Sequence, residues 1–208
     1  MRTTVAVSLA ALVPVVAGCN PYTSTSASVN DPSDIALDDY GAPVTGNGPI
    51  PCPPASNDGA IQFSWDSGAM KVKGTCQAGL RVGTWKGGYA NGEDRWKAEF
   101  TEGVINGTFK AWYPDGELRV KMEFLNNVPN GTFKAYWPNG ETREKGEFVN
   151  GKRNGCWYTY YENGKDHTKG TYADDDKVLS WFTWSEDGTR KRDKYGGKAL
   201  HGECLLML

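Results

Sequence analysis

The sequence of 208 residues has few of the side chains from which catalytic and metal sites are built. It contains two histidines, His167 and His201, and no Cys-x-x-Cys pair. Neither histidine accompanies an activated serine or cysteine, and no nucleophile elbow or phosphate-binding loop is present. No His, Asp or Glu is spaced as a partner for the cysteines, which argues against a reactive thiol or a thiolate metal site. We therefore predict a non-enzymatic protein with no catalytic residue, no metal and no cofactor.

The sequence also lacks a strong net charge. It has 23 Lys and Arg against 25 Asp and Glu, which gives a formal net charge of −2. Such a chain produces no global field that would attract a polyanion. Nucleic acid is therefore not expected as a partner.

No apolar run is long enough to cross a membrane. The run from Val5 to Val16 has about 12 residues, whereas a spanning helix needs roughly 20. It follows the positive Met1-Arg2 start, which is the pattern of a signal peptide. Ala17-Gly18-Cys19 at its end resembles the lipobox of bacterial lipoproteins. The resemblance implies that residues 1–18 are removed and that Cys19 becomes the lipid-modified first residue.

An exported bacterial lipoprotein, held to a membrane through Cys19, is therefore expected. Asn20 stands where the inner-membrane retention signal has aspartate, which favours the outer membrane. The alternative is an ordinary secretory signal that leaves Cys19 as a free thiol.

Residues 19–58 are rich in Ser, Thr, Pro, Asp and Gly and show neither helix nor strand periodicity. Such a segment buries too little apolar surface to offset the entropy of ordering. We predict a disordered tether between the membrane and the folded part. The alternative is a tether that partly packs on the first folded unit through Ile50 and Cys52.

Glycine and aromatic residues are abundant, with 26 Gly, 8 Trp and 10 Tyr. One set of glycines recurs every 24 residues at Gly68, Gly92, Gly116, Gly140, Gly164 and Gly188, and a second set at Gly59, Gly83, Gly107, Gly131 and Gly155. A fixed period of this size is typical of a repeat array, in which each unit buries its apolar face by stacking on its neighbours. We place the array at residues 59–202.

Each unit predicts a β-hairpin. The stretch Gly131 to Tyr136 alternates as a strand with Phe133 and Ala135 on one face. Pro138-Asn139-Gly140 then forms a tight turn, because glycine after asparagine adopts the left-handed conformation. The second strand ends on an aromatic residue such as Phe148. An isolated hairpin is marginal in water, so six hairpins in series must pair edge to edge.

The pattern Gly-x-aromatic-x-x-x-aromatic, then Asn/Asp-Gly, then Gly-x-Phe/Tyr, as in Gly155 to Gly164, resembles the MORN repeat. It is most similar to the bacterial MORN variant, some members of which are grouped as antitoxin-like. The resemblance covers residues 59–202. It implies an all-β fold, an elongated single twisted antiparallel sheet of about six consecutive 24-residue hairpins, with a binding or assembly role and no catalytic residues.

The last residues are more apolar. The tail from Gly197 to Leu208 resembles the start of one more unit and ends in Leu205-Leu206-Met207-Leu208. We predict a capping strand at residues 203–208. The alternative is an exposed apolar tail that meets a partner.

Two rows of positive charge follow the 24-residue period. One contains Lys71, Arg95, Arg119, Arg143, His167 and Lys191, and the other contains Lys73, Lys97, Lys121, Lys145 and Lys169. Simple alternation places both rows on the face opposite the large aromatic residues. The predicted ligand face consists of Lys110, Trp112, Arg119, Lys121, Lys134, Tyr136, Arg143 and Lys145. Such a face suits an anionic polymer or lipid head groups; the alternative is a solvated face whose lysines pair with Glu99, Glu123 and Glu147.

Four cysteines remain beyond Cys19, an even number in an exported chain, which favours disulfides. Order along the chain favours Cys52–Cys76 and Cys156–Cys204 among the three possible connectivities. The second pair fits less well, because a tail that continued the register would carry Cys204 about two units away from Cys156.

These features together predict a membrane-anchored protein-interaction or envelope-scaffold module. The expected partners are the membrane, through the lipid anchor, and another protein. One alternative is a binder of envelope glycan or anionic lipid through the basic and aromatic face. Another is an antitoxin-like protein that neutralises a toxic partner.

Overall fold

The computed structural model describes residues 37, 38, 43, 48–53, 56, 58–197 and 204. The predicted signal peptide, Cys19 and most of the predicted tether lie outside the described residues. So does the predicted capping strand, apart from Cys204.

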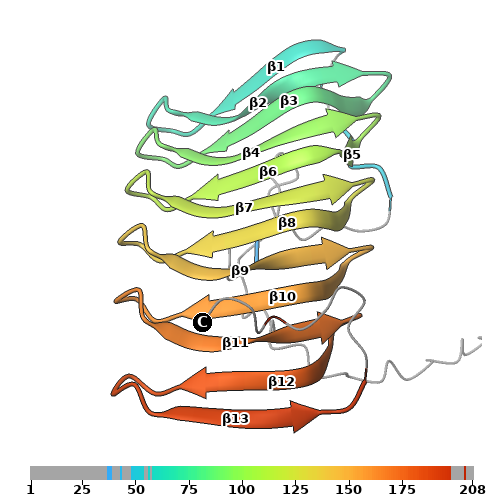
Figure 1. The fold of residues 1–208 in the computed structure, drawn as a ribbon. Coiled ribbons are helices and arrows are strands. Elements are labelled where there is room, and N and C mark those ends of the chain that lie inside the picture. Colours follow the sequence, from blue (N-terminus) through green and yellow to red (C-terminus); the bar gives the residue numbers. More distant parts are fainter. Residues whose placement is uncertain are drawn as a thin grey trace, which may run out of the picture.

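Among the described residues, thirteen strands form one antiparallel sheet, and their hairpin turns project at both sides (Figure 1). The strands are β1 (Gly59–Ser64), β2 (Met70–Gln77), β3 (Leu80–Gly88), β4 (Asp94–Thr101), β5 (Val104–Ile105), β6 (Gly107–Trp112), β7 (Leu118–Leu125), β8 (Val128–Tyr136), β9 (Thr142–Val149), β10 (Lys152–Tyr160), β11 (Asp166–Ala173), β12 (Asp176–Trp184) and β13 (Arg190–Tyr195).

The strands pair in chain order, except that the short β5 pairs only with β4. Because β5 and β6 are two pieces of one expected strand, interrupted at Asn106, the sheet contains six hairpin units. The predicted all-β class and the open antiparallel array of hairpins are confirmed. We call the side that carries Trp85, Phe109 and Trp157 the core face, and the opposite side the outer face.

The turn within each unit has the predicted geometry. In the third unit, the Tyr113 N–H donates to the Glu117 carbonyl at 2.8 Å, and the Gly116 N–H donates to the Tyr113 carbonyl at 3.0 Å. Asp115 accepts a hydrogen bond from the Glu117 N–H at 3.1 Å. Pro-Asp-Gly thus closes a three-residue loop.

The connections between units are tight, because the chain turns on two residues. Glu102 and Gly103 have φ of 49° and 81°, and Asn150 and Gly151 have φ of 50° and 81°. Two successive residues of positive φ make a type I′ turn, whose twist matches the twist of the strands. The following strand therefore begins at Lys152 rather than at Gly155.

Gly155 illustrates the second set of glycines. Its φ is +69°, and a Cβ placed there would meet no atom within 4 Å. We expect Gly155→Ala to lower the free energy of unfolding by about 1 kcal/mol for conformational reasons alone. Chemical denaturation measures this loss; unchanged stability would contradict the assigned backbone conformation.

Much of the core of this single sheet consists of tryptophan rings that pack on glycines of the preceding strand. Trp85 and Trp157 are 0% and 1% exposed, and they cover Gly74 and Gly146 at less than ordinary Cβ contact distance. The N-terminal segment adds Leu37, which packs against the same cluster. Intimate packing of rings on backbone removes them from water without a second sheet.

Residues 48–52 dock on the turns of successive units. The Ile50 N–H donates to Gly103 at 2.7 Å and the Cys52 N–H donates to Gly79 at 2.9 Å. Asn127 Nδ2 donates to the Gly48 carbonyl at 2.9 Å. Cys52 thus packs on the first unit, as the alternative of a partly packed tether expects, whereas Ile50 binds the turn after the second unit.

Both expected disulfides are present, Cys52–Cys76 and Cys156–Cys204. The Cys204 sulfur lies 3.1 Å from the Thr171 hydroxyl, beside β10 and β11. Thr171 pairs with Cys156 on the outer face, so Cys204 lies against this face rather than beyond β13. The expected separation of two units between Cys156 and Cys204 is therefore absent, and the two cysteines lie close enough to bond.

Candidate functional site

A straight row of lysines crosses the outer face. Each member pairs directly, in antiparallel register, with the lysine of the next strand, from β2 to β9. The lysine row comprises Lys73, Lys86, Lys97, Lys110, Lys121, Lys134 and Lys145. Neighbouring strands are about 4.8 Å apart, so seven like charges follow one another at close spacing.

Acidic groups compensate only part of the lysine row. Lys86 pairs with Asp94 at 2.9 Å, and Lys97 lies 3.7 Å from Glu99. Lys145 lies over the ring of Tyr158, at 4.9 Å from the centroid. These pairs are partly exposed, so water and salt weaken them.

Half-buried aromatic residues lie next to the lysine row on the same face. Trp112 pairs with Leu118, and Tyr136 pairs with Thr142, two residues along the strand from Lys110 and Lys134. The structure thus brings together six of the predicted ligand-face residues, namely Lys110, Trp112, Lys121, Lys134, Tyr136 and Lys145.

Arg119 and Arg143 do not lie on this face, and their predicted placement is wrong. Each is the extra residue of a β-bulge, since Trp112 pairs with Leu118 and Ala111 with Val120, which skips Arg119. An extra residue reverses the alternation of side chains at that point. Arg119 therefore lies over the Tyr113 ring, at 5.4 Å from its centroid.

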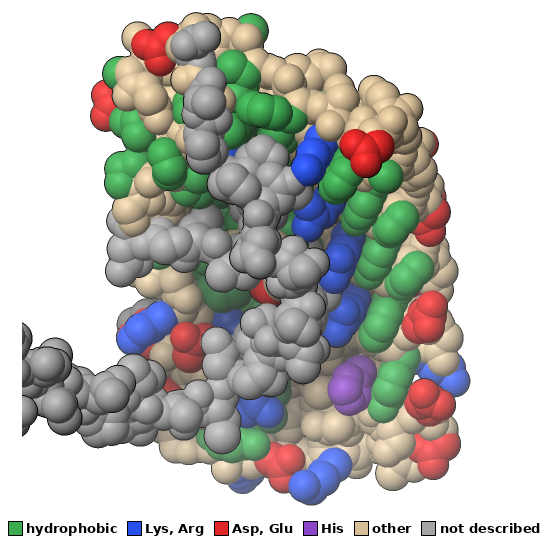
Figure 2. All heavy atoms as spheres, turned by 180° about the vertical axis from the view of Figure 1, so that it is seen from behind, with side chains coloured by type: hydrophobic (Ala, Val, Ile, Leu, Met, Phe, Trp, Pro, Cys, Tyr) green, Lys and Arg blue, Asp and Glu red, His purple; other side chains and the backbone are tan. Residues whose placement is uncertain are grey.

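The same bulge recurs in five units and builds a cation–ring column on the core face. Its members are Lys71 with Trp65, Arg119 with Tyr113, Arg143 with Trp137 and His167 with Tyr161. Arg95 holds the equivalent bulge position in the second unit, and its charge acts on the Tyr89 hydroxyl. Figure 2 views the core face and shows basic side chains in a file beside hydrophobic ones, with a histidine at the lower end.

The rings of this column also bind each unit to the next. Tyr113 Oη donates to the Tyr136 carbonyl at 2.8 Å, and Trp137 Nε1 donates to the Tyr160 carbonyl at 3.1 Å. Burial raises the pKa of the Tyr89 and Tyr113 hydroxyls, and nearby arginines partly offset the rise. The residue before each turn must carry a ring with an O–H or N–H that can donate to the next unit, which explains why Tyr or Trp occupies this position. Ser185 occupies it in the last unit and ends the column.

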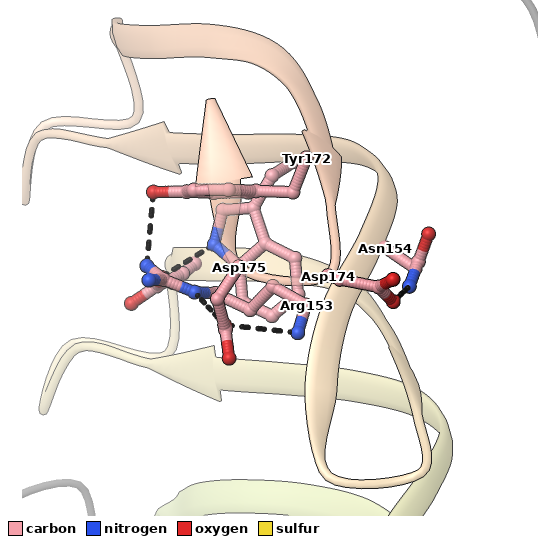
Figure 3. A network of polar contacts seen from close by, with 7 residues as sticks. Arg153, Asn154, Tyr172, Asp174 and Asp175 are labelled. Atoms are coloured by element: carbon pink, nitrogen blue, oxygen red, sulfur yellow. Dashed lines mark hydrogen bonds and ion pairs between the residues drawn. The ribbon is translucent and has the colours of Figure 1, made fainter. Parts of the chain in front are cut away.

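A polar network closes the turn between the fifth and sixth units (Figure 3). Arg153 Nε donates to Asp175 at 2.9 Å and its Nη1 donates to the Tyr172 hydroxyl at 2.9 Å. Asn154 donates to Asp174 at 3.0 Å. Asp174 and Asp175 therefore form the turn between β11 and β12, and their carboxylates accept hydrogen bonds from Asn154 and Arg153.

Sequence reasoning missed a buried carboxylate on the core face. Glu144 is 6% exposed and accepts a hydrogen bond from Trp157 Nε1. The corresponding residues of earlier units are Val72, Trp96 and Val120. A glutamate where the earlier units have apolar residues is visible when the units are aligned, and this signal could have identified Glu144 as an unusual core position.

Two kinds of site are missing from the part of the chain that the structure covers. No group of three or more His, Cys, Asp or Glu in that part could hold a metal ion. No helix in the same part is long and apolar enough to cross a membrane.

A comparison with family models matches the MORN repeat variant at residues 105–126, 129–150 and 153–174. Each match starts two residues after a type I′ turn and contains a first strand, its three-residue turn and a second strand. A comparison with curated proteins gives no match. MORN repeats are generally modules for protein or membrane interaction. Residues 105–174 therefore carry three consecutive units that match the MORN repeat variant.

Proposed function

We propose that the protein is a non-enzymatic scaffold of the bacterial cell envelope, which holds an acidic partner protein on its outer face. In this proposal Cys19 carries a lipid in the outer membrane, and the tether that follows it connects the lipid to the sheet. The lysine row is the contact surface for the partner.

The lysine row is the observation that supports this function. Like charges directly opposite one another destabilise a sheet, and here the opposition is repeated across seven strands. Lys73, Lys121 and Lys134 are exposed, so packing does not require a lysine at these positions. A row that costs stability and serves no packing purpose fits a surface that an acidic partner neutralises.

The cost can be measured. Lys121 faces Lys110 on one side and Lys134 on the other. We expect Lys121→Glu to raise the free energy of unfolding by about 0.5–1 kcal/mol, because two repulsive pairs become attractive. Urea denaturation at low salt tests this; a loss of stability would remove the argument from the lysine row.

Capture from detergent-solubilised envelope tests the function itself. The full-length lipoprotein is expected to retain one stoichiometric protein, and Lys121→Glu plus Lys134→Glu is expected to lose it. Lys152→Glu plus Lys194→Glu changes exposed lysines outside the lysine row by the same charge and is the matched control. Equal retention by both double variants would overturn the proposed surface. A captured protein that is toxic when produced alone would identify the antitoxin-like role.

A second candidate is an anionic lipid surface or glycan. The half-buried rings of Trp112 and Tyr136 beside the lysine row favour it, because rings and lysines together suit a membrane interface. Vesicles with and without phosphatidylglycerol distinguish it: binding that requires the anionic lipid and is lost in Lys121→Glu plus Lys134→Glu supports the lipid candidate.

A further inference from the structure

The two ends of the sheet differ in how their edges are protected. β1 and β13 are the terminal strands, and among the described residues each pairs with one strand only (Figure 1). Four of the six residues of β13 are Lys or Arg, and all four are exposed. Exposed charges of this kind keep a sheet edge from pairing with other strands. β1 reads Gly-Ala-Ile-Gln-Phe-Ser and is exposed at five of its six residues, so it has neither charge nor proline to protect its edge.

Gln62 is the residue at which β1 departs most clearly from the repeat on the outer face. It occupies the position that holds Lys86, Lys110 and Lys134 in the next three units. It pairs with Lys73, the first member of the lysine row, so the row stops one strand short of the edge. A lysine protects an unpaired edge, and β1 lacks it where it would protect most. A neutral residue at this position suits an edge that pairs with another strand.

The core face of β1 departs from the repeat as well. Ile61 stands where the other units have Trp or Phe, and Phe63 stands where they have Gly, Ala or Thr. Ile61 pairs with Gly74 and Phe63 with Val72, which places both on the core face. The Phe63 side chain is 36% exposed. The edge therefore presents apolar side chains on the core face and uncharged ones on the outer face.

We propose that β1 pairs with β1 of a second copy of this chain, antiparallel, about a twofold axis that passes through Gln62. The axis is perpendicular to the sheet, so the core faces of both copies lie on the same side. Residues directly opposite in an antiparallel pair share a face. In this register Ile61 faces Phe63 of the second copy, Ala60 faces its Ser64, and Gln62 faces its own counterpart. The two sheets become one, and the two lysine rows lie end to end on the same side.

The side chains of β1 favour a second β1 over other strands. A lysine on the axis would face its own counterpart with Cβ atoms about 5 Å apart, which explains why the lysine of the next three units is replaced by Gln62. Glutamine amides on the axis can donate to and accept from each other. The symmetric contact also covers Phe63 of both copies.

The alternatives fit the charges less well. Pairing of β1 with β13 of another copy would set the Lys and Arg residues of β13 beside a strand with no counter-charge. It would also produce an open chain of molecules rather than a closed pair. A strongly charged foreign strand meets the same lack of counter-charge. The contact uses the edge of the sheet rather than the lysine row, so it does not depend on the proposed function.

Cysteine cross-linking of the detergent-solubilised full-length protein tests the axis. Gln62→Cys should give a disulfide-linked dimer under mild oxidation, because Cβ atoms directly opposite each other lie about 4.5–5.5 Å apart, within a small adjustment of disulfide geometry. Ala60→Cys is the matched control on the same strand and face. In the proposed register the two copies of residue 60 lie about four residues apart, roughly 13 Å, so this variant should not cross-link. Peptide mapping shows that the two native disulfides remain intact.

Size-exclusion chromatography with light scattering gives a second readout, without a new thiol. We expect the parent protein to dimerise with rising concentration. Gln62→Lys should raise the dissociation constant of the dimer by at least about fivefold, because like charges then face each other on the axis. An equal mixture of Gln62→Lys and Gln62→Glu should restore the dimer. Lys194→Glu, an exposed charge change on β13, should leave it unchanged.

Several results would overturn the inference. These are a parent protein that stays monomeric at all concentrations, equal cross-linking of the two cysteine variants, or a Gln62→Lys dimer as strong as that of the parent. Loss of the dimer in Lys194→Glu alone would place the contact at β13 and overturn it too. Urea denaturation of each variant shows that it is folded.

Discussion

Replacing Gly146 by alanine is expected to lower the free energy of unfolding by about 3 kcal/mol, the upper part of the range for overpacked cores. A Cβ on Gly146 would lie 2.0 Å from Cε3 of Trp157. The indole is 1% exposed, so it has no open space into which to move. Gly196→Ala is the control, since a Cβ there meets nothing within 4 Å, and it should change stability by less than about 0.5 kcal/mol.

A larger residue at position 146 should be tolerated better when the ring that packs on it is smaller. Where the first strand has Phe133 in place of a tryptophan, the preceding unit has Met122 in place of a glycine. We therefore expect Gly146→Met plus Trp157→Phe to be more stable than Gly146→Met alone. A double-mutant cycle from urea denaturation measures the coupling. Additive losses, with no recovery in the double variant, would contradict this account of the core.

The second large effect is expected on removing the disulfide that holds the C-terminal segment. Cys156 and Cys204 are separated by 48 residues, and Cys52 and Cys76 by 24. Closing loops of these lengths in the unfolded chain is expected to stabilise the fold by roughly 4 kcal/mol for the longer loop and roughly 3.5 kcal/mol for the shorter one. Cys204→Ser is therefore expected to lower the free energy of unfolding by about 4 kcal/mol.

Cys52→Ser is the comparison, because it opens the other disulfide. We expect a slightly smaller loss from the shorter loop. Loss of the hydrogen bonds of residues 48–52 to the turns would add to it. Denaturation of the two variants under oxidising conditions gives both values. A Cys204→Ser protein as stable as the parent would show that this disulfide does not constrain the fold.

The repeat architecture could be predicted because its determinants are local. Glycine after Asn or Asp fixes the turn, as at Gly116 and Gly140, and the 24-residue period fixes the number of hairpins. The pairing of large with small core residues was also present in the sequence. Trp85, Trp157 and Trp181 each follow a glycine by 11 residues, whereas Phe109 and Phe133 follow Ala98 and Met122. This pairing was not recognised before the structure.

The bulge at Arg119 was predictable in principle from counting. A three-residue loop that joins Tyr113 to Glu117 would pair Ala111 with Arg119. Ala111 instead pairs with Val120, since both are apolar and buried. One residue must therefore be extra, and it is the arginine. Alternation counted without this residue assigns Arg119 to the wrong face.

Other features depend on contacts between distant segments, which local patterns do not encode. Residues 48–52 resemble a linker in composition, yet their backbone groups meet the free groups of the turns at Gly79 and Gly103. The return of Cys204 to the outer face follows from its disulfide with Cys156. The hydrogen bond from Trp157 Nε1 to Glu144 likewise forms only when β9 and β10 are in register.

The separation of the two basic faces, and the assignment of partner binding to the outer one, are tested most directly by one comparison. Lys121→Gln plus Lys134→Gln and Arg119→Gln plus Arg143→Gln remove the same charge from opposite faces. Both are compared with the parent protein in capture of the stoichiometric partner from solubilised envelope. We predict that the lysine variant loses the partner and that the arginine variant retains it. Retention by the lysine variant together with loss by the arginine variant would contradict the proposed function.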